Sequence, residues 1–252
     1  MAAWFSRLFT GQEGRDGALA INQQALLAGW RQLPEVDISR SHYRSRYVLV
    51  DVETAARSLK SDRLVSIAAL ALVDGLIDFQ EAFHVVLAHD APGADAAAGE
   101  ASEANAPTAP NPALVIAGVP PVDALISFLS FAGKAPLVAY HSPLVGAMIE
   151  RALVEHLGIV SAQPCIDLAW VLSDLFRDVS DVGDLSATQG GLDAWLAHFG
   201  IASIQRHNAV SDAYVIAKLL QIAIARAARK GFDSPGSLLE LEKARRHLHQ
   251  SG

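Results

Sequence analysis

The chain has 252 residues, of which 51% are hydrophobic and 19% are charged. This balance suits one globular domain with a substantial core, and no apolar run reaches the roughly 20 residues that a membrane-spanning helix needs. The formal net charge of −7 excludes a surface built as a whole for long duplex DNA, so any nucleic-acid contact should be short and local. The single cysteine, Cys165, excludes an internal disulfide and fits a reducing compartment. We therefore expect a soluble, cytoplasmic protein with no membrane partner.

The first predicted elements are helices in an N-terminal extension, residues 1–46. Leu26, Trp30 and Leu33 recur at helical spacing within NQQALLAGWRQL, and the aromatic-rich start, MAAWFSRLF, could form a shorter helix. Either terminal helix could contact a protein partner, although packing onto the chain's own domain is the commoner role for such a segment.

A sheet is predicted next. The segments YVLVDVE (47–53), RLVSIAALALV (63–73) and FQEAFHVVL (79–87) are rich in apolar and β-branched residues, and the Asp-Gly pair between the last two is a strong hairpin signal. Residues 89–112 are rich in Ala, Pro, Gly and Asn and show no periodicity. Because such a segment cannot bury enough apolar surface to offset its ordering entropy, we predict a disordered insertion within the domain.

Helices dominate the second half of the chain. The patterns VDALISFLSFAG, AMIERALVEHLG and LDAWLAHFG predict helices, PCIDLA predicts a short strand, and a long helix should end at Gly231. Residues 231–252 then predict a C-terminal amphipathic helix in which Glu242 precedes Arg246 by four residues. A hairpin followed by alternating helices and short strands favours a mixed α/β layered fold over residues 47–230.

Two carboxylates end the first predicted strand, in the sequence YVLVDVETAAR. Residues two apart on a strand point to the same face, so Asp51 and Glu53 should project together. Open α/β sheets place ligands beyond such strand ends, and adjacent carboxylates favour a hard divalent ion such as Mg²⁺ or Mn²⁺. The simpler alternative is that both acids cap the segment that follows.

A second polar pattern opens the last long helix. The sequence QRHNAVSDAYVIAKLL places His207 just before that helix and Asp212 in its first turn. A helix N-terminus favours an acidic residue by itself, and an isolated histidine is usually structural. Together with Asp51 and Glu53, however, they supply a third carboxylate and an imidazole that titrates near neutral pH. Such a set can hold metal ions and deprotonate water for phosphodiester hydrolysis.

This ordered pair of motifs, D-x-E-T on a first strand and H-x-A-x-x-D-A at the start of a late helix, resembles the DnaQ-like DEDD 3′–5′ exonucleases. The subtype is the one with a histidine in its last motif, which includes the proofreading subunit of bacterial DNA polymerase III. The resemblance covers roughly residues 47–229 without the insertion. It implies an α/β fold of the ribonuclease H-like type, a mixed central sheet flanked by helices, and stepwise removal of nucleotides from a 3′ end.

The resemblance also implies a role for each candidate residue. Asp51, Glu53 and Asp212 match the metal-binding acids, and His207 matches the base that activates the attacking water. The implied cofactors are two Mg²⁺ or Mn²⁺ ions, and the implied partner is a single-stranded nucleic-acid 3′ end or a nucleotide. Thr54 would contact this substrate, although two alanines follow it where the family usually has Thr/Ser-Gly.

The middle motif of the family lacks its acid in this chain. Family members carry a pattern resembling H-N-x-x-F-D-x-x-F-L, whose Asp helps to hold the second metal ion. The segment YHSPLVGAMI places Val145 at that position, or Gly146 if His141 is aligned with the family histidine. Glu150, five positions after Val145, should face elsewhere on a helix, and Asp167 belongs to another element. Losing one electrostatic stabiliser of this kind typically costs on the order of 10²–10³ in rate.

Two functional hypotheses from different classes follow. The first is a metal-dependent 3′–5′ exonuclease that is impaired at its second metal position, and the retained set of Asp51, Glu53, His207 and Asp212 favours it. The second is a catalytically inactive module on an exonuclease fold that binds a nucleotide, a nucleic-acid end or a protein partner, and Val145 favours it.

Overall fold

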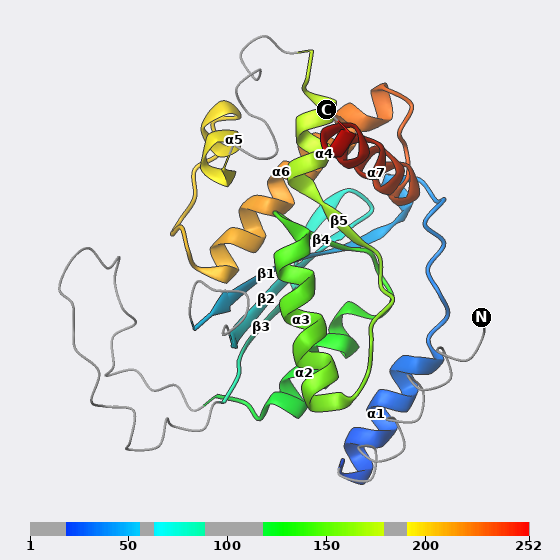
Figure 1. Cartoon of the computed structure of the whole chain (residues 1–252), viewed down its shortest axis with the longest axis vertical. Helices are drawn as coiled ribbons and strands as arrows, with labels where there is room; N and C mark the ends of the chain where they lie inside the picture. The colour runs from blue at the N-terminus through cyan, green and yellow to red at the C-terminus, as the bar shows by residue number, and fades with distance from the viewer. Residues whose placement is uncertain (1–18, 56–62, 89–117, 179–190, 252) are drawn as a thin grey trace, which may run out of the picture.

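A mixed five-stranded sheet forms the centre of the computed structural model, which describes residues 19–55, 63–88, 118–178 and 191–251 (Figure 1). The strand order is β3-β2-β1-β4-β5. The first three strands pair antiparallel, and β4 and β5 continue the sheet in parallel with β1. The strands are β1 (Arg46–Thr54), β2 (Leu64–Val73), β3 (Leu76–Val86), β4 (Leu137–Ala139) and β5 (Cys165–Asp167). This arrangement confirms the mixed sheet flanked by helices that the sequence predicts.

Helices cover both faces of this sheet (Figure 1). Side chains of α1, α2 and α3 belong to one buried apolar cluster, and side chains of α4, α5, α6 and α7 belong to the other. The helices are α1 (Ile21–Gln32), α2 (Pro121–Ala132), α3 (Ser142–Leu157), α4 (Leu168–Leu175), α5 (Leu192–His198), α6 (Ala209–Arg229) and α7 (Pro235–Ser251), and a short 3₁₀ turn spans His42–Arg44. Among the described residues, no helix is both long and apolar enough to cross a membrane.

Strand β1 separates the two clusters by simple alternation. Tyr47 and Leu49 point into the cluster that contains α6, whereas Val48 and Val50 point into the cluster that contains α3. Because side chains alternate along a strand, the odd-numbered positions that follow Leu49 also face α6. The packing of β1 therefore decides which helix its terminal carboxylates meet.

The predicted hairpin is confirmed at Asp74 and Gly75. Both residues have positive φ, 52° and 83°, which matches the turn type that suits two antiparallel strands. The predicted insertion, at 89–112, and the short helix predicted at the start of the chain lie outside the described residues. The division of the chain into an extension, a domain and a C-terminal helix stays a prediction.

The helix predicted over NQQALLAGWRQL is present as α1, but the three residues at helical spacing do not share one buried face. Trp30 is buried, whereas Leu26 is 53% exposed and Leu27 is buried instead. The position of α1 against the end of α2 explains the difference. Trp30 Nε1 donates to the carbonyl of Gly133 over 2.8 Å, so Trp30 fixes the rotation of the helix about its axis.

Two further boundaries differ from the prediction because side chains and backbone geometry cap the helices. Helix α3 starts at Ser142, five residues before the predicted AMIERALVEHLG segment, since His141 turns the chain with a φ of 60°. Helix α4 begins at Leu168, inside the predicted strand PCIDLA. There the Asp167 carboxylate accepts a hydrogen bond from the backbone N–H of Ala169, which caps the new helix.

A buried ionic cluster attaches α7 to the end of β5. Asp167 is 1% exposed and pairs with Arg246 over 2.8 Å, and Arg246 also pairs with Glu242 over 3.0 Å, which confirms the predicted pairing along α7. Glu242 in turn accepts a hydrogen bond from the backbone N–H of Asp167 over 2.8 Å. Burial raises the pKa of both carboxyl groups, so the Arg246 guanidinium is what keeps two negative charges tolerable there.

Replacing Arg246 with alanine should lower the free energy of unfolding by roughly 3 kcal/mol, because two buried carboxylates lose the cation between them. Urea denaturation at pH 7 measures the change. Lys243→Ala is the matched control, since it breaks an exposed ion pair with Glu240 on the same helix and should cost less than about 0.5 kcal/mol. Equal losses in the two variants would contradict a stabilising role for the cluster.

Candidate active site

The first and last motifs meet where β1 ends against the N-terminus of α6. The backbone N–H of Ala209, the first residue of α6, donates to Glu53 Oε1 over 3.2 Å. Ser66 of β2 donates from its hydroxyl to Glu53 Oε2 over 2.9 Å. Glu53 therefore connects the sheet to the helix that carries Asp212, and both of its carboxylate oxygens have protein donors.

Asp51 lies on the same face of β1 as Glu53 and is partly buried. Burial is the first cause that raises the pKa of Asp51, to about 7, and the negative charges of Asp212 and Glu53 add to it. The positive charge of Arg206 and a hydrogen bond from the backbone of Val52 act in the opposite direction. The structure thus brings the carboxylates of Asp51, Glu53 and Asp212 close enough to repel one another electrostatically.

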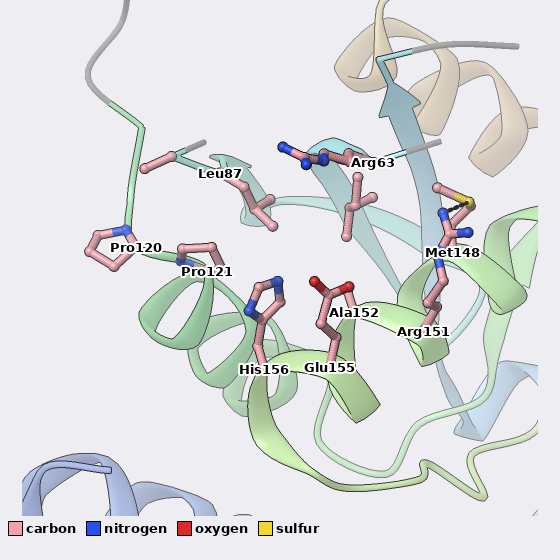
Figure 2. Close-up of a pocket in the computed structure, with 11 residues that line it drawn as sticks. Arg63, Leu87, Pro120, Pro121, Met148, Arg151, Ala152, Glu155 and His156 are labelled. Carbon is pink, nitrogen blue, oxygen red and sulfur yellow. Dashed lines mark hydrogen bonds between the residues drawn. The ribbon is translucent and has the colours of Figure 1, made fainter. Parts of the chain in front are cut away.

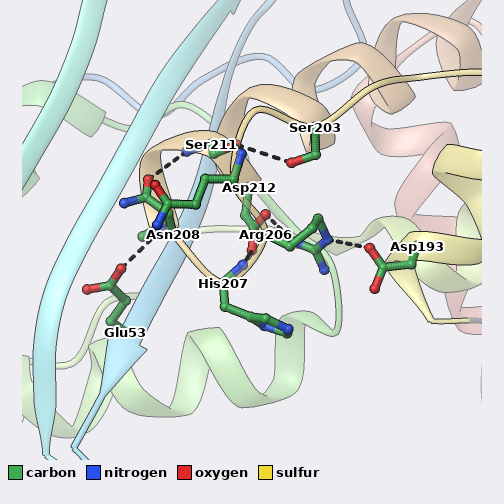
Figure 3. A network of polar contacts seen from close by, with 10 residues as sticks. Glu53, Asp193, Ser203, Arg206, His207, Asn208, Ser211 and Asp212 are labelled. Atoms are coloured by element: carbon green, nitrogen blue, oxygen red, sulfur yellow. Dashed lines mark hydrogen bonds and ion pairs between the residues drawn. The ribbon is translucent and has the colours of Figure 1, made fainter. Parts of the chain in front are cut away.

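Arg206 is the functional-site residue that the sequence analysis missed. Its Nη1 donates to Asp212 Oδ1, and its Nε donates to Asp193 Oδ1 in the first turn of α5 (Figure 3). The remaining oxygen of Asp212 accepts a hydrogen bond from the backbone N–H of His207 over 3.2 Å. The one signal in the sequence is the arginine directly before the motif histidine in QRHN, which nothing marks as a partner of the acid six positions later.

His207 is exposed and has a positive φ of 60°, which is uncommon for a residue with a side chain. Its contact with Asp212 is made by its backbone, as described above, rather than by its ring. Asn208 follows as the N-cap of α6, and its side chain accepts from the backbone N–H of Ser211 over 3.1 Å. These two residues set the direction in which α6 leaves the site.

Val145, at the position of the missing acid, is a core residue. It is 4% exposed in the first turns of α3 and packs in the cluster that lies on the other face of β1. In the other alignment register the position is Gly146, so neither register supplies a carboxylate there. Glu150 is exposed, and Asp167 accepts from the backbone N–H of His141 over 3.1 Å besides pairing with α7. Asp167 therefore has a structural role, since its partners lie on α4, α7 and the turn before α3.

The end of β1 departs from regular pairing at the predicted substrate-contacting residue. The register shifts between Glu53 and Thr54, and the backbone N–H of Ala55 donates to the carbonyl of Arg63 over 3.0 Å. The residues that would complete the turn, 56–62, lie outside the described part of the chain. The role of Thr54 stays a prediction.

A cavity of about 550 Å³ lies beside the end of β1 on the α3 side (Figure 2). Its wall includes Arg63 at the start of β2 and Met148 on α3, one helical turn after Val145. Arg151, Glu155 and His156 of the same helix also line it, together with Leu87 and with Pro120 and Pro121 at the start of α2. Basic, acidic and apolar side chains therefore line the same cavity.

The donor set fits one hard divalent ion in type but not in its present arrangement. Three carboxylates are the ligands that Mg²⁺ and Mn²⁺ prefer. Within the described residues, however, no group of three His, Cys, Asp or Glu side chains is placed to hold a metal ion. The reason is visible in the contacts, because Glu53 and Asp212 give their oxygens to Ser66, Arg206 and backbone N–H groups.

Comparisons with known proteins bear on the same region. No protein-family model matches the sequence. DNA polymerase III PolC-type from Clostridium perfringens (strain 13 / Type A) is 25% identical over 185 residues, which is 73% of this chain and 12% of that protein. The chain therefore corresponds to a small part of PolC.

Solved structures of exonuclease I share the fold. Escherichia coli exonuclease I in complex with a dT13 oligonucleotide matches with a TM-score of 0.53 and 16% identity, over 74% of this chain and 42% of that chain. A zinc-bound form of the same enzyme with single-stranded DNA gives 0.54 and 15%, over 74% and 42%. Exonuclease I from Methylocaldum szegediense gives 0.51 and 15%, over 73% and 41%.

The fold is ribonuclease H-like, as in the exonuclease I structures, which confirms the fold class that the resemblance implies. The chain spans less than half the length of the exonuclease I structures. The match to part of PolC and the shared fold both agree with the predicted resemblance to the DnaQ-like DEDD exonucleases.

The raised pKa of Asp51 predicts how stability depends on pH in the absence of divalent ions. The folded protein retains a proton that the unfolded chain releases between the ordinary value of 3.8 and about 7. The stability contributed by this protonation is present at low pH and is lost as the pH rises through about 7.

Asp51→Asn should therefore stabilise the protein at pH 8 in the presence of EDTA, because it removes a partly buried charge that Asp212 repels. The gain should shrink as the pH falls from 8 to 4, since the wild-type carboxyl then takes up its proton. Urea denaturation across this pH range checks both expectations. A gain that is independent of pH would show that Asp51 is not the titrating group.

Proposed function

We propose that this chain is an exonuclease-fold domain that binds the 3′ end of a single-stranded nucleic acid and hydrolyses its terminal phosphodiester bond slowly, in dependence on Mg²⁺ or Mn²⁺. The observation that carries this proposal is the meeting of Asp51, Glu53 and Asp212 at the junction of β1 and α6. Exonuclease I, which shares the fold, is known in complexes with single-stranded oligonucleotides.

Each residue has a chemical task in this proposal. Asp51, Glu53 and Asp212 hold the ion, which when bound lowers the pKa of water and neutralises phosphate charge. His207 accepts the proton of the attacking water, and its exposed position beside Asp212 suits a group that must exchange protons with solvent. Thr54 at the end of β1 contacts the terminal nucleotide.

Slow turnover follows from Val145. In a two-metal reaction the second ion stabilises the leaving oxygen, and in this chain its carboxylate is replaced by a buried aliphatic side chain. The loss of one such stabiliser costs on the order of 10²–10³ in rate. Asp51, Glu53 and Asp212 would still hold one ion, which would lower the pKa of the attacking water.

The cavity beside the end of β1 supports the binding part of the proposal. Its volume of about 550 Å³ is in the usual range for small-ligand sites and is large enough for a nucleotide. Arg63 and Arg151 on its wall suit phosphate groups, and Leu87 with the two prolines suits a base. We propose that the terminal nucleotide enters this cavity (Figure 2).

A second candidate function is favoured by Arg206. A guanidinium paired with Asp212 reduces the negative charge that draws a metal ion, which suits a module that binds an end or a protein partner without cutting. The two functions differ in one measurement. A module that only binds should retain oligonucleotides without shortening them under any metal condition.

The decisive experiment is to restore the acid. Val145→Asp should raise the rate of shortening of a 5′-labelled single strand in Mn²⁺ by at least about tenfold, because it returns a ligand to the second metal position. Val145→Asn is the matched control, since it has the same shape without the charge and should give no increase. Assays with DNA and RNA strands compare the two substrate classes.

Two outcomes would contradict the proposed hydrolysis. One is a wild-type rate no higher than that of Asp51→Asn, together with no gain in Val145→Asp. The other is equal gains in Val145→Asp and Val145→Asn, which would point to a change in packing rather than a restored ligand. Circular dichroism of each variant verifies that a polar group at this buried position has not unfolded the chain.

A further inference from the structure

The carboxylate cluster already contains a cation of its own. Arg206 lies in the segment before α6, and its side chain is 24% exposed. Its guanidinium joins two acids from different helices, the buried Asp212 of α6 and Asp193 of α5, which is 68% exposed (Figure 3). The positive charge is permanent, because an arginine side chain stays protonated at any physiological pH.

This contact uses the part of Asp212 that a metal ion would need. Arg206 takes one carboxylate oxygen, and the backbone N–H of His207 takes the other. A metal–carboxylate bond requires a free lone pair in the right direction, so an ion can reach Asp212 only if the guanidinium moves. The same positive charge also acts on Asp51, across the cluster.

Asp193 offers Arg206 a second position. It bonds a different nitrogen of the guanidinium from the one that bonds Asp212, and it faces solvent. If the contact to Asp212 breaks, the pair with Asp193 can persist at low cost, because an exposed ion pair needs little desolvation. Arg206 therefore has one buried and one exposed carboxylate partner.

We propose that Arg206 is an internal cation that competes with divalent metal ions for Asp212, so that metal binding requires its guanidinium to shift toward Asp193. This inference rests on the proposed function only in that Asp212 is a metal ligand. Competition from Arg206 would raise the free concentration of the ion at which the site fills. The alternative is an ordinary structural ion pair with no influence on metal binding.

Metal affinity separates the two alternatives without any assay of hydrolysis. Binding of MnCl₂ to the full chain is measured by titration calorimetry in the absence of nucleic acid. Arg206→Gln should bind Mn²⁺ at least about tenfold more tightly than the wild type, and Arg206→Lys, which keeps the charge but loses the planar fork, should lie between them. In Arg206→Gln combined with Asp212→Asn, the gain should vanish.

Arg226→Gln is the matched control. Arg226 lies near the far end of α6, is 22% exposed, and pairs with the exposed Asp178, so its environment resembles that of Arg206 away from the cluster. Its replacement should leave the affinity for Mn²⁺ unchanged. An increase as large as that of Arg206→Gln would mean that net charge alone is responsible, which would overturn the proposal.

Stability in EDTA provides a second readout that a charge effect on metal binding cannot imitate. Without metal, Arg206→Gln should lower the melting temperature, and saturating Mn²⁺ should restore it. The proposal that Arg206 competes with metal ions would be overturned by unchanged or weaker Mn²⁺ binding in Arg206→Gln. It would also be overturned if neither the wild type nor Arg206→Gln bound Mn²⁺ measurably. Tighter binding in Arg206→Gln without hydrolysis in any variant would leave the internal cation in place and remove only the proposed nuclease activity.

Discussion

Electrostatic repulsion among three acids at the junction of β1 and α6 is the constraint on which the site depends. Asp51 and Glu53 lie at the end of β1 at this junction, and Asp212 lies in the first turn of α6. Such a cluster is stable only if donors or cations reach it, and this chain supplies both from its own residues. Ser66 and two backbone N–H groups bond the carboxylates of Glu53 and Asp212, and Arg206 brings positive charge to the cluster.

The two faces of β1 have different roles. On the α6 face, Tyr47 and Leu49 are buried in the core, and the same alternation continues to Asp51 and Glu53. The strand register that buries the core residues therefore also positions the acids. On the other face, Val48 and Val50 of β1 pack in the same apolar cluster as Val145 of α3, which is 4% exposed. A shift of one residue in the pairing of β1 would exchange the two faces, which makes this register a requirement for the site as well as for the core.

Short-range periodicity predicts a mixed α/β fold, whereas the approach of Asp212 to Asp51 and Glu53 is predicted only by the resemblance to the DnaQ-like exonucleases. Alternation places Asp51 and Glu53 on one face, and the polar start of a long apolar helix places Asp212 in its first turn. The contact between Arg206 and Asp212 could not be predicted, since it depends on the path of a loop whose residues follow no period. For the same reason the buried face of α1 does not follow from its apolar spacing, since Trp30 is held by the distant carbonyl of Gly133.

The buried ionic cluster between α7 and β5 has a mechanical consequence. Arg246 holds Asp167, and Asp167 receives the backbone N–H of His141, the residue that turns the chain into α3. A pull on the last helix would thus be transmitted to the start of the helix that carries Val145. Bulky fusions or surface immobilisation through the C-terminal end would load this connection, whereas attachment ahead of α1 would leave it untouched.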